Sequence, residues 1–425
     1  MMLGLYSWMM GLAQPLLRRK LRRRGIEEPG YLEAVEERFG RYAPDAGQGF
    51  IWLHAVSLGE TRAAAILIER LREQIPGMRL LLTHGTATGR AEGKRLLREG
   101  DVQAWLPWDT APVALRFLDH FKPRIGILME TEVWPQLAAS CKARGVPLVM
   151  ANGRLSEKSL GHAQRLGWLS RPAYRALAGV WAQTLDDAAR FKELDTKVLG
   201  VFGNLKFDAA PDAAQLAQGK AWRAASARPV VMFASAREGE EKMLLDEIRV
   251  HAGSPPKVQW LIVPRHPQRF DEVAALIAQQ GFSVARRSAY SGAMPVADVW
   301  LGDSLGEMAL YYGLADVALL GGSFLPLGGQ NLIEAAACGC PVVMGPSTFN
   351  FADAAELSLQ AGAAVRVADM TQGVQAAVAL ATDEVRREVV AKSALRFAGE
   401  HRGAALKTAQ AIAQQLGSNS DSGHA

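Results

Sequence analysis

The chain of 425 residues lacks the usual marks of a disulfide framework, a metal site or a redox cofactor. Its three cysteines, Cys141, Cys338 and Cys340, have a spacing that suits neither disulfides nor zinc. No His-x-x-x-His pair, aspartate-rich cluster or strand-bounded Gly-x-Gly-x-x-Gly turn occurs. We therefore expect no metal and no cofactor, which argues against a nicotinamide oxidoreductase. The cysteines are expected to be small, reduced core residues in a cytosolic compartment.

The N-terminal apolar stretch is slightly shorter than the roughly 20 residues that span a bilayer. Residues 2–17 are uncharged, and residues 18–24 then carry six positive charges, whereas a cleaved signal peptide has its charges first. We expect residues 1–24 to be a membrane-anchor helix with a basic cluster, which either spans the membrane or lies in its interface. The alternative is an amphipathic helix packed on its own domain. Anionic lipids of the inner, cytoplasmic leaflet of the membrane would attract the cluster.

The net charge of +5 does not indicate a nucleic-acid partner. Without the six charges of residues 18–24, the rest of the chain carries a net charge of −1. No aromatic residues alternate with basic ones elsewhere, so we expect no nucleic acid to bind.

Strand-like and helix-like stretches alternate along most of the chain, which predicts an α/β fold with parallel sheets. Residues 208–220, rich in alanine and aspartate, are the best candidate linker. We expect two Rossmann-like domains, residues 25–208 and residues 209–425, whose strand exits face a common cleft. The polar tail of residues 417–425 is expected to be disordered.

In the first half, polar residues follow the predicted strands. Ser57 and Glu60 have the spacing of a capping box, although Glu60 at the sheet edge could also be a general base. A carboxylate in the first turn of a helix should have a normal or low pKa. Glu130 and Glu132, two apart, point to one side while the backbone stays extended, and either mark a site or form salt bridges. Lys206 follows the last strand of this half.

In the second half, the apolar run 317–320 leads through four glycines to a helix start at Asn331. Such a turn suits a phosphate, because glycines allow close backbone approach and first-turn N–H groups lack helical partners. Asn331 with Glu334, Ser304 with Glu307, and Ser235 with Glu238 also have capping-box spacing. Arg265 at another strand exit could bind a phosphate or a base carbonyl, or lie on the surface.

Nine motifs in order resemble the 3-deoxy-D-manno-octulosonic acid (Kdo) transferases of lipopolysaccharide synthesis. They are WLHAVSLGE, LMETEVWPQL, ANGRLSEKS, GNLKFD, SAREGEE, VPRHPQRF, GDSLGEM, GGSFLPLGGQN and MGPSTFNF. The resemblance implies a GT-B fold and transfer of Kdo, without a metal, from CMP-Kdo to the tetra-acylated lipid A precursor, lipid IVA. The runner-up interpretation is another GT-B transferase that uses a UDP-sugar donor on a lipid.

The resemblance also assigns roles to single residues. It implies that Glu60 is the catalytic base and that Glu130 and Lys206 support the transition state. Lys206 would contact either Glu130 or the Kdo carboxylate. The positions that match CMP-binding segments are Pro264, Arg265, Leu305, Gly306, Glu307, Asn331, Leu332, Ile333 and Glu334. Two residues depart from the pattern: Gln330 stands where histidine is common, and Leu305 where methionine is common.

Overall fold

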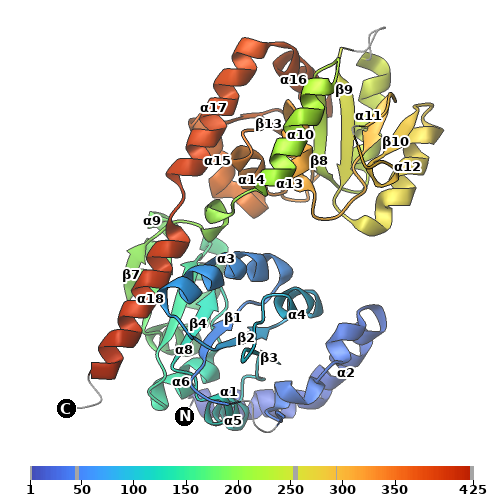
Figure 1. Cartoon of the computed structure of the whole chain (residues 1–425). Helices are drawn as coiled ribbons and strands as arrows, with labels where there is room; N and C mark the ends of the chain where they lie inside the picture. The colour runs from blue at the N-terminus through green and yellow to red at the C-terminus, as the bar shows by residue number, and fades with distance from the viewer. Residues whose placement is uncertain (1, 44–46, 252–256, 293, 422–425) are drawn as a thin grey trace. The chain divides into compact units, whose positions relative to one another are not determined.

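The structure is a computed structural model that describes residues 2–43, 47–251, 257–292 and 294–421. The chain divides into two compact units (Figure 1). The first contains residues 1–208 and 402–425, and the second contains residues 209–401. Each unit is built around its own sheet of seven strands.

The first sheet is parallel, in the order β3-β2-β1-β4-β5-β6-β7. Its strands are short apolar runs: β1 Ile51–His54, β2 Leu80–His84, β3 Val102–Trp105, β4 Ile125–Met129, β5 Leu148–Gly153, β6 Gly179–Ala182 and β7 Val198–Val201. β1 pairs with β2 on one side and with β4 on the other. The strand order therefore reverses at β1 and β4, and such a switch point is where α/β sheets hold ligands.

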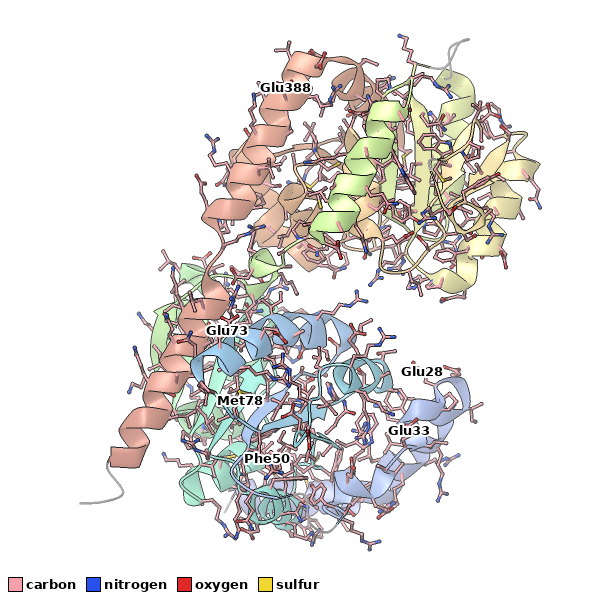
Figure 2. The ribbon with its side chains drawn as sticks, viewed as in Figure 1. Glu28, Glu33, Phe50, Glu73, Met78 and Glu388 are labelled. Carbon is pink, nitrogen blue, oxygen red and sulfur yellow. The ribbon has the colours of Figure 1, made fainter. Side chains whose placement is uncertain are left out.

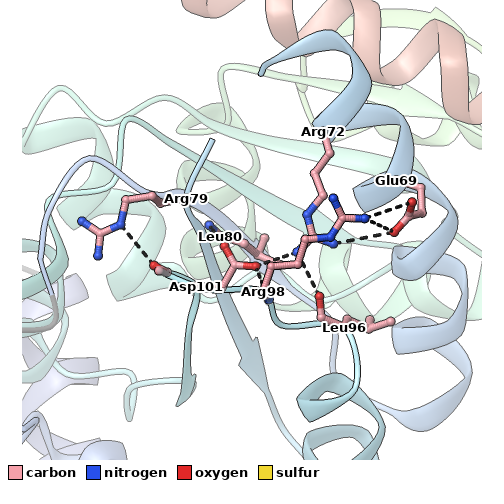
Figure 3. A network of polar contacts seen from close by, with 8 residues as sticks. Glu69, Arg72, Arg79, Leu80, Leu96, Arg98 and Asp101 are labelled. Atoms are coloured by element: carbon pink, nitrogen blue, oxygen red, sulfur yellow. Dashed lines mark hydrogen bonds and ion pairs between the residues drawn. The ribbon is translucent and has the colours of Figure 1, made fainter. Parts of the chain in front are cut away.

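Helices cover both faces of this sheet. They are α3 Leu58–Gln74, α4 Ala87–Lys94, α5 Ala111–Phe121, α6 Pro135–Ala143, α7 Glu157–Arg165, α8 Gly167–Arg175 and α9 Leu185–Glu193, with the 3-10 segments η1 Pro29–Leu32, η2 Val35–Phe39 and η3 Leu205–Asp208. A polar network anchors the C-terminal part of α3 (Figure 3). Arg72 pairs with the buried Asp101 at 2.6 Å, and Asp101 also accepts a hydrogen bond from the N–H of Leu80 at 2.8 Å. This network holds the helix whose first turn carries Glu60.

The second sheet repeats this plan in the order β10-β11-β9-β8-β12-β13-β14, again with parallel pairs. Its strands are β8 Val230–Ala236, β9 Gln259–Pro264, β10 Val284–Arg286, β11 Val299–Leu301, β12 Val317–Leu320, β13 Val342–Met344 and β14 Ala364–Arg366. The remaining elements are α10 Ala213–Ala225, α11 Glu240–His251, η4 Pro267–Arg269, α12 Phe270–Gln279, η5 Arg287–Ala289, α13 Met308–Leu314, α14 Leu332–Ala337, η6 Phe349–Phe351, α15 Ala352–Gln360, α16 Met370–Thr382 and α17 Glu384–Glu400. Here the switch point lies between β8 and β12.

Three boundaries differ from the sequence-based expectation. The expected linker of residues 208–220 is mostly helix, because α10 begins at Ala213 with Asp212 as its N-cap. The last helix, α18 Ala404–Asp421, belongs to the first unit, although residues 209–425 were expected to form one domain. It lies along α3, where Ala409, Ile412 and Leu416 join the apolar core (Figure 1). The expected disordered tail is helical as far as Asp421, and residues 422–425 lie outside the described residues.

The N-terminal stretch forms two helices, α1 Met2–Leu12 and α2 Gln14–Glu27. Polar side chains dock α1 on the first unit: Tyr6 donates a hydrogen bond to Asp109 at 2.9 Å, and Ser7 Oγ accepts one from the N–H of Ala111 at 2.9 Å. Several apolar side chains of these helices remain exposed, among them Leu5, Trp8, Leu12 and Leu16. In the part of the chain that the structure describes, no helix combines the length and apolarity needed to cross a membrane.

The cysteines are core residues, as expected from the sequence. Cys141, Cys338 and Cys340 are all buried, and none forms a disulfide.

Candidate active site

The first cluster of polar residues lies at the switch point of the first sheet. The loop after β1 contains Ser57, which caps α3 by accepting a hydrogen bond from the N–H of Glu60 at 3.4 Å. The Glu60 carboxylate turns back and accepts from the N–H of Val56 at 2.9 Å and from the Ser57 hydroxyl at 3.4 Å. The capping role of this pair is therefore present, and it holds the carboxylate at the edge of the sheet.

The pKa of Glu60 contradicts the sequence-based expectation of a normal or low value. Burial, together with the smaller effect of the negative charges of Glu130 and Glu132, raises it to about 7, against the hydrogen bonds from Val56 and Ser57. The helix start stabilises the anion less than the loss of solvent destabilises it. A carboxylate that titrates near neutral pH is suited to accept a proton.

Glu130 is paired on the other side of the switch point. It follows β4 and forms an ion pair with Lys206, the Glu130 Oε1 and Lys206 Nζ atoms being 3.2 Å apart. Asn152 Nδ2 donates to the same oxygen at 3.4 Å, and Asn152 Oδ1 accepts from the N–H of Leu205 at 3.0 Å. Residues that follow β4, end β5 and follow β7 thus meet at one place.

The sequence-based interpretation of Glu130 and Glu132 required an extended backbone at these residues. The backbone at Glu130 is not extended. Glu130 has a φ of 60°, and β4 ends one residue earlier, at Met129. The two carboxylates consequently have different partners: Glu132 accepts from the Trp134 indole N–H at 3.2 Å, and burial raises the pKa of Glu132. Only Glu130 carries the ion pair.

The second cluster lies at the switch point of the second sheet. Gly322, Gly328 and Gly329 all have positive φ, which fits the role expected of glycines in this turn. Asn331 caps α14 by accepting from the N–H of Ile333 at 3.2 Å. The turn is held from outside by Asn350, whose Nδ2 donates to the carbonyl oxygen of Leu327 at 3.0 Å.

A buried carboxylate from α11 also holds this turn. Glu240, with 0% of its surface exposed, accepts from the N–H groups of Gly322 at 2.7 Å, Phe324 at 3.1 Å and Arg237 at 3.0 Å. These bonds join the exit of β8 to the exit of β12. Glu240 therefore fixes the backbone of the glycine turn.

The structure brings two of the predicted nucleotide segments together. Arg265, next after Pro264 at the end of β9, donates from Nε to Gln330 Oε1 at 3.1 Å, so Gln330 positions that arginine. In the third segment, Glu307 pairs with Arg287 at 2.7 Å, and the carbonyl oxygen of Gly306 accepts from Gln215 at 2.9 Å. Leu305 is 73% exposed.

Other expected residues have different roles. Leu332 and Ile333 are each 1% exposed, so in a nucleotide site they would offer backbone N–H groups rather than side chains. Glu334 lies in the first turn of α14. The capping boxes expected at Ser304 and Ser235 do not form. The N-cap of α13 is Glu307, and Ser235 lies within β8 with a φ of 56°.

Sequence reasoning missed Asn152 and Glu240 as site residues. Both lie within motifs that carry the family resemblance, but their partners are distant in the sequence. Asn152 contacts Glu130, 22 positions away, and Glu240 contacts Gly322, 82 positions away. The usable signal would have been a polar residue near the C-terminal end of a buried strand, since Asn152 lies in the last two residues of β5 and Glu240 begins the helix after β8.

Two parallel α/β sheets define the class. One has a carboxylate and an ion pair at its switch point, and the other has a glycine turn and a helix start. The two seven-stranded parallel sheets with their helices make a GT-B-like α/β fold. Among solved structures, Anabaena Alr3699/HepE in complex with UDP shares the fold, with a TM-score of 0.57, 16% identity and coverage of 87% of this chain and 100% of that one.

Sequence relatives identify the family. The model of 3-deoxy-D-manno-octulosonic-acid transferase (kdotransferase) matches residues 33–209. The chain is 46% identical to the 3-deoxy-D-manno-octulosonic acid transferase of Bordetella pertussis and 30% identical to that of Haemophilus influenzae; each match covers 94% of this chain and 95% of the relative. The chain belongs to the 3-deoxy-D-manno-octulosonic acid transferase family.

Proposed function

We propose that this transferase moves Kdo, with inversion, from CMP-Kdo to the tetra-acylated lipid A precursor, lipid IVA, in lipopolysaccharide core biosynthesis. The observation that carries the proposal is Glu60, a carboxylate with a pKa of about 7 at the switch point of the first sheet, with Glu130 and Lys206 on the other side of that point. Family membership indicates that the transferred sugar is Kdo, and the position of Glu60 suits a base that accepts the proton of an acceptor hydroxyl.

The reaction needs one proton transfer and one substitution. Glu60 accepts the proton of a glucosamine hydroxyl while that oxygen attacks the anomeric carbon of Kdo. The bond from this carbon to the phosphate oxygen breaks, and CMP leaves with the electron pair from the opposite face. At pH values above about 7 most of the Glu60 population is ionised and can accept the proton.

Glu130 and Lys206 act on the charge that develops. Positive charge grows on the anomeric carbon as CMP departs, and the Glu130 carboxylate stabilises it. We propose that Lys206 holds Glu130 in place, because the two groups are already paired at 3.2 Å. Asn152 supports the same oxygen and is a positioning residue.

The second unit binds CMP. Arg265 offers a guanidinium, and the glycine turn with the N-terminus of α14 offers backbone N–H groups to the phosphate. Pro264, the segment 305–307 and Glu334 complete the proposed nucleotide site. These groups offset the negative charge of the leaving group, and we propose that no metal or cofactor takes part.

The acceptor carries acyl chains, so the enzyme works at a bilayer, which we propose is the cytoplasmic face of the inner membrane. The exposed apolar side chains of α1 and the arginines of α2 support an interfacial attachment to anionic lipids. Each basic residue near such a surface contributes about 1 kcal/mol. Replacing the exposed Leu5 and Trp8 with glutamine should release the protein from vesicles while leaving Tyr6 and Ser7 to dock α1.

The test is a mass-spectrometric assay with CMP-Kdo, generated in situ, and lipid IVA. Product heavier by one or more Kdo residues is expected, and its mass counts the additions. Competition between CMP and UDP tests the donor, and tighter binding of UDP would favour the alternative UDP-sugar transferase. A folded protein that binds CMP but forms no product would overturn the proposed acceptor.

A further inference from the structure

An aromatic and cationic cluster lies beside the exits of β2 and β3. Trp105, the last residue of β3, is fully buried and stacks on Tyr31, with ring centroids 6.3 Å apart and planes 7° apart. The Arg38 guanidinium lies 3.8 Å from the centroid of the Trp105 ring, and that of Arg90 lies 4.9 Å from it. We call Tyr31, Arg38, Arg90 and Trp105 the Trp105 cluster.

Aromatic faces hold these two guanidinium groups, and a carboxylate pairs with only one of them. Arg90 forms an ion pair with Glu37 at 2.8 Å, and Glu37 also accepts from the N–H of Trp105 at 2.9 Å. Within residues 2–43, 47–251, 257–292 and 294–421, Arg38 forms no ion pair, and its buried Nε has no hydrogen-bond partner. Its Nη2 donates to the carbonyl oxygen of Gly85 at 3.2 Å.

An arginine in this setting favours a bound anion. Burial lowers the pKa of Arg38 to about 10, which shows that the folded protein destabilises its charge. A guanidinium that packs by its face keeps its N–H groups in the plane of the group, where they can form two parallel bonds to phosphate oxygens. Arg38 is half-buried as a residue, and because its Nε is buried, the Nη groups are those that a phosphate would contact.

Backbone contacts connect Arg38 to the proposed base. Gly85, which accepts from Arg38, donates its own N–H to the carbonyl oxygen of Val56 at 3.2 Å. The N–H of Val56 in turn donates to the Glu60 carboxylate at 2.9 Å. The Trp105 cluster therefore lies at the same edge of the first sheet as Glu60. On its other side lies the basic helix α2, whose Arg24 guanidinium is 5.5 Å from the centroid of the Tyr31 ring.

We propose that Arg38, supported by Arg90 and Trp105, binds a phosphate monoester of the lipid acceptor and so places the acceptor hydroxyl at Glu60. This inference rests on the proposed function, whose acceptor, lipid IVA, is an acylated diglucosamine that also carries two phosphates. Inorganic phosphate has the same chemistry and would compete for the site. The effect should be on acceptor binding and should leave the CMP-Kdo site unchanged.

The test compares wild type and Arg38→Gln on two acceptors with the same acyl chains, one bisphosphorylated and one enzymatically dephosphorylated, at constant ionic strength. On the bisphosphorylated acceptor, the variant should raise the acceptor KM about 10–100-fold, the loss expected for charge-assisted hydrogen bonds. Its kcat and its KM for CMP-Kdo should stay close to wild type. On the dephosphorylated acceptor, the two proteins should have equal KM values.

Two variants separate the guanidinium geometry from charge. Arg41→Gln removes the same charge three residues away, from an exposed side chain that pairs with Glu36 at 3.2 Å, and should leave the acceptor KM unchanged. Arg38→Lys keeps the charge without the planar fork, so its KM should lie between wild type and Arg38→Gln. An equal loss for Arg41→Gln and Arg38→Gln would overturn the proposal.

Further outcomes distinguish the inference from the function on which it rests. No transfer by wild type to either acceptor would overturn the proposed function, and this inference with it. Transfer in which Arg38→Gln loses equally on both acceptors would overturn this inference alone. If Arg38→Gln does not fold, inorganic phosphate added to wild type decides: it should inhibit competitively against the bisphosphorylated acceptor only, and equal inhibition with both acceptors would contradict a phosphate site.

Discussion

The two units contain a carboxylate at the same place in their folds, in the connection that leaves the strand beside the switch point. In the first unit Glu60 follows β1, and in the second Glu240 follows β8. Glu60 is partly exposed and receives one backbone N–H, from Val56. Glu240 is fully buried and receives three, from Gly322, Phe324 and Arg237.

The two carboxylates differ in how many of their hydrogen-bond acceptor positions are occupied by backbone N–H groups of the protein. Burial raises the pKa of both carboxylates, but several backbone N–H groups counter this at Glu240. Glu240 uses its acceptor capacity within the protein, so it stabilises one backbone conformation. Glu60 retains capacity for a substrate proton. The two carboxylates therefore share a position in the fold, and the number of backbone N–H donors distinguishes the proposed base, Glu60, from Glu240, which holds the backbone.

The largest expected effect is at Glu60. Glu60→Gln keeps the size and the hydrogen bond from Val56 but removes the base, so kcat should fall about 10²–10⁴-fold in the mass-spectrometric assay. CMP affinity should be unchanged, since the proposed nucleotide site lies in the other unit. Glu73→Gln is the matched control on the same helix (Figure 2), because Glu73 is exposed and pairs only with Arg70 at 2.9 Å. Equal losses in the two variants would remove the distinction between Glu60 and other carboxylates.

The next largest expected effect is on the pH dependence of activity, through Glu130, whose charge raises the pKa of Glu60. Activity should fall as pH drops through about 7, because Glu60 becomes protonated. Glu130→Gln removes a negative charge, so it should move this acid limb of kcat/KM to lower pH while lowering the rate about 100-fold. A pH–rate profile from 5.5 to 9 checks both. A limb that stays in place would mean that another group titrates.

Glu240→Gln should affect binding more than chemistry. An amide places a donor against backbone N–H groups that need an acceptor, so the glycine turn should shift and CMP should bind about 10–100-fold more weakly by calorimetry. The acid limb of the pH profile should stay at about 7. Glu238→Gln, an exposed neighbour, should leave CMP affinity unchanged. A loss of kcat with intact CMP binding would contradict the structural role of Glu240.

The smallest expected effect is on folding stability. Here Glu60→Gln should be a gain, whereas the same substitution lowers activity. The folded-state pKa of about 7 lies above the ordinary value of 4.5, so the folded state binds the proton more tightly. Stability should therefore fall as pH rises from about 4.5 to 7, and stay lower above it. Glu60→Gln removes this penalty and should be more stable than wild type by about 1–2 kcal/mol at pH 8, with little difference near pH 4.5. Thermal unfolding at the two pH values measures the change.

The sequence predicted the first sheet better than the second. All seven strands of the first unit correspond to apolar runs that the sequence identifies, and five of them, β1, β2, β4, β5 and β6, are buried along their whole length. In the second unit, the sequence around β10, β11 and β14 contains no apolar run long enough to predict a strand. Each has three residues, and β10 and β14 end in arginine. Pairing with neighbouring strands, rather than a local pattern, determines these short strands.

The sequence identified the candidate residues, whose roles stay predictions, but it did not predict their pKa values or their pairing. Strand exits identified Glu60, Glu130, Lys206 and Arg265. The pKa of Glu60 depends on burial and on two carboxylates 70 or more positions away, which no local pattern contains. The pairing of Lys206 with Glu130 likewise needs β7 and β4 to end at the same edge of one sheet.

The placement of α18 has a consequence for how the protein is made. Asp208 accepts hydrogen bonds from the N–H groups of Gly403 and, at 2.6 Å, Ala405, so the chain leaves the first unit and returns to it at one point. The second unit is in effect an insertion within the first. During synthesis the sheet that carries Glu60 appears first, but α18, which packs along α3 in the same apolar core, follows only after the second unit has been translated. The core of the first unit is therefore completed by a segment made after the second unit.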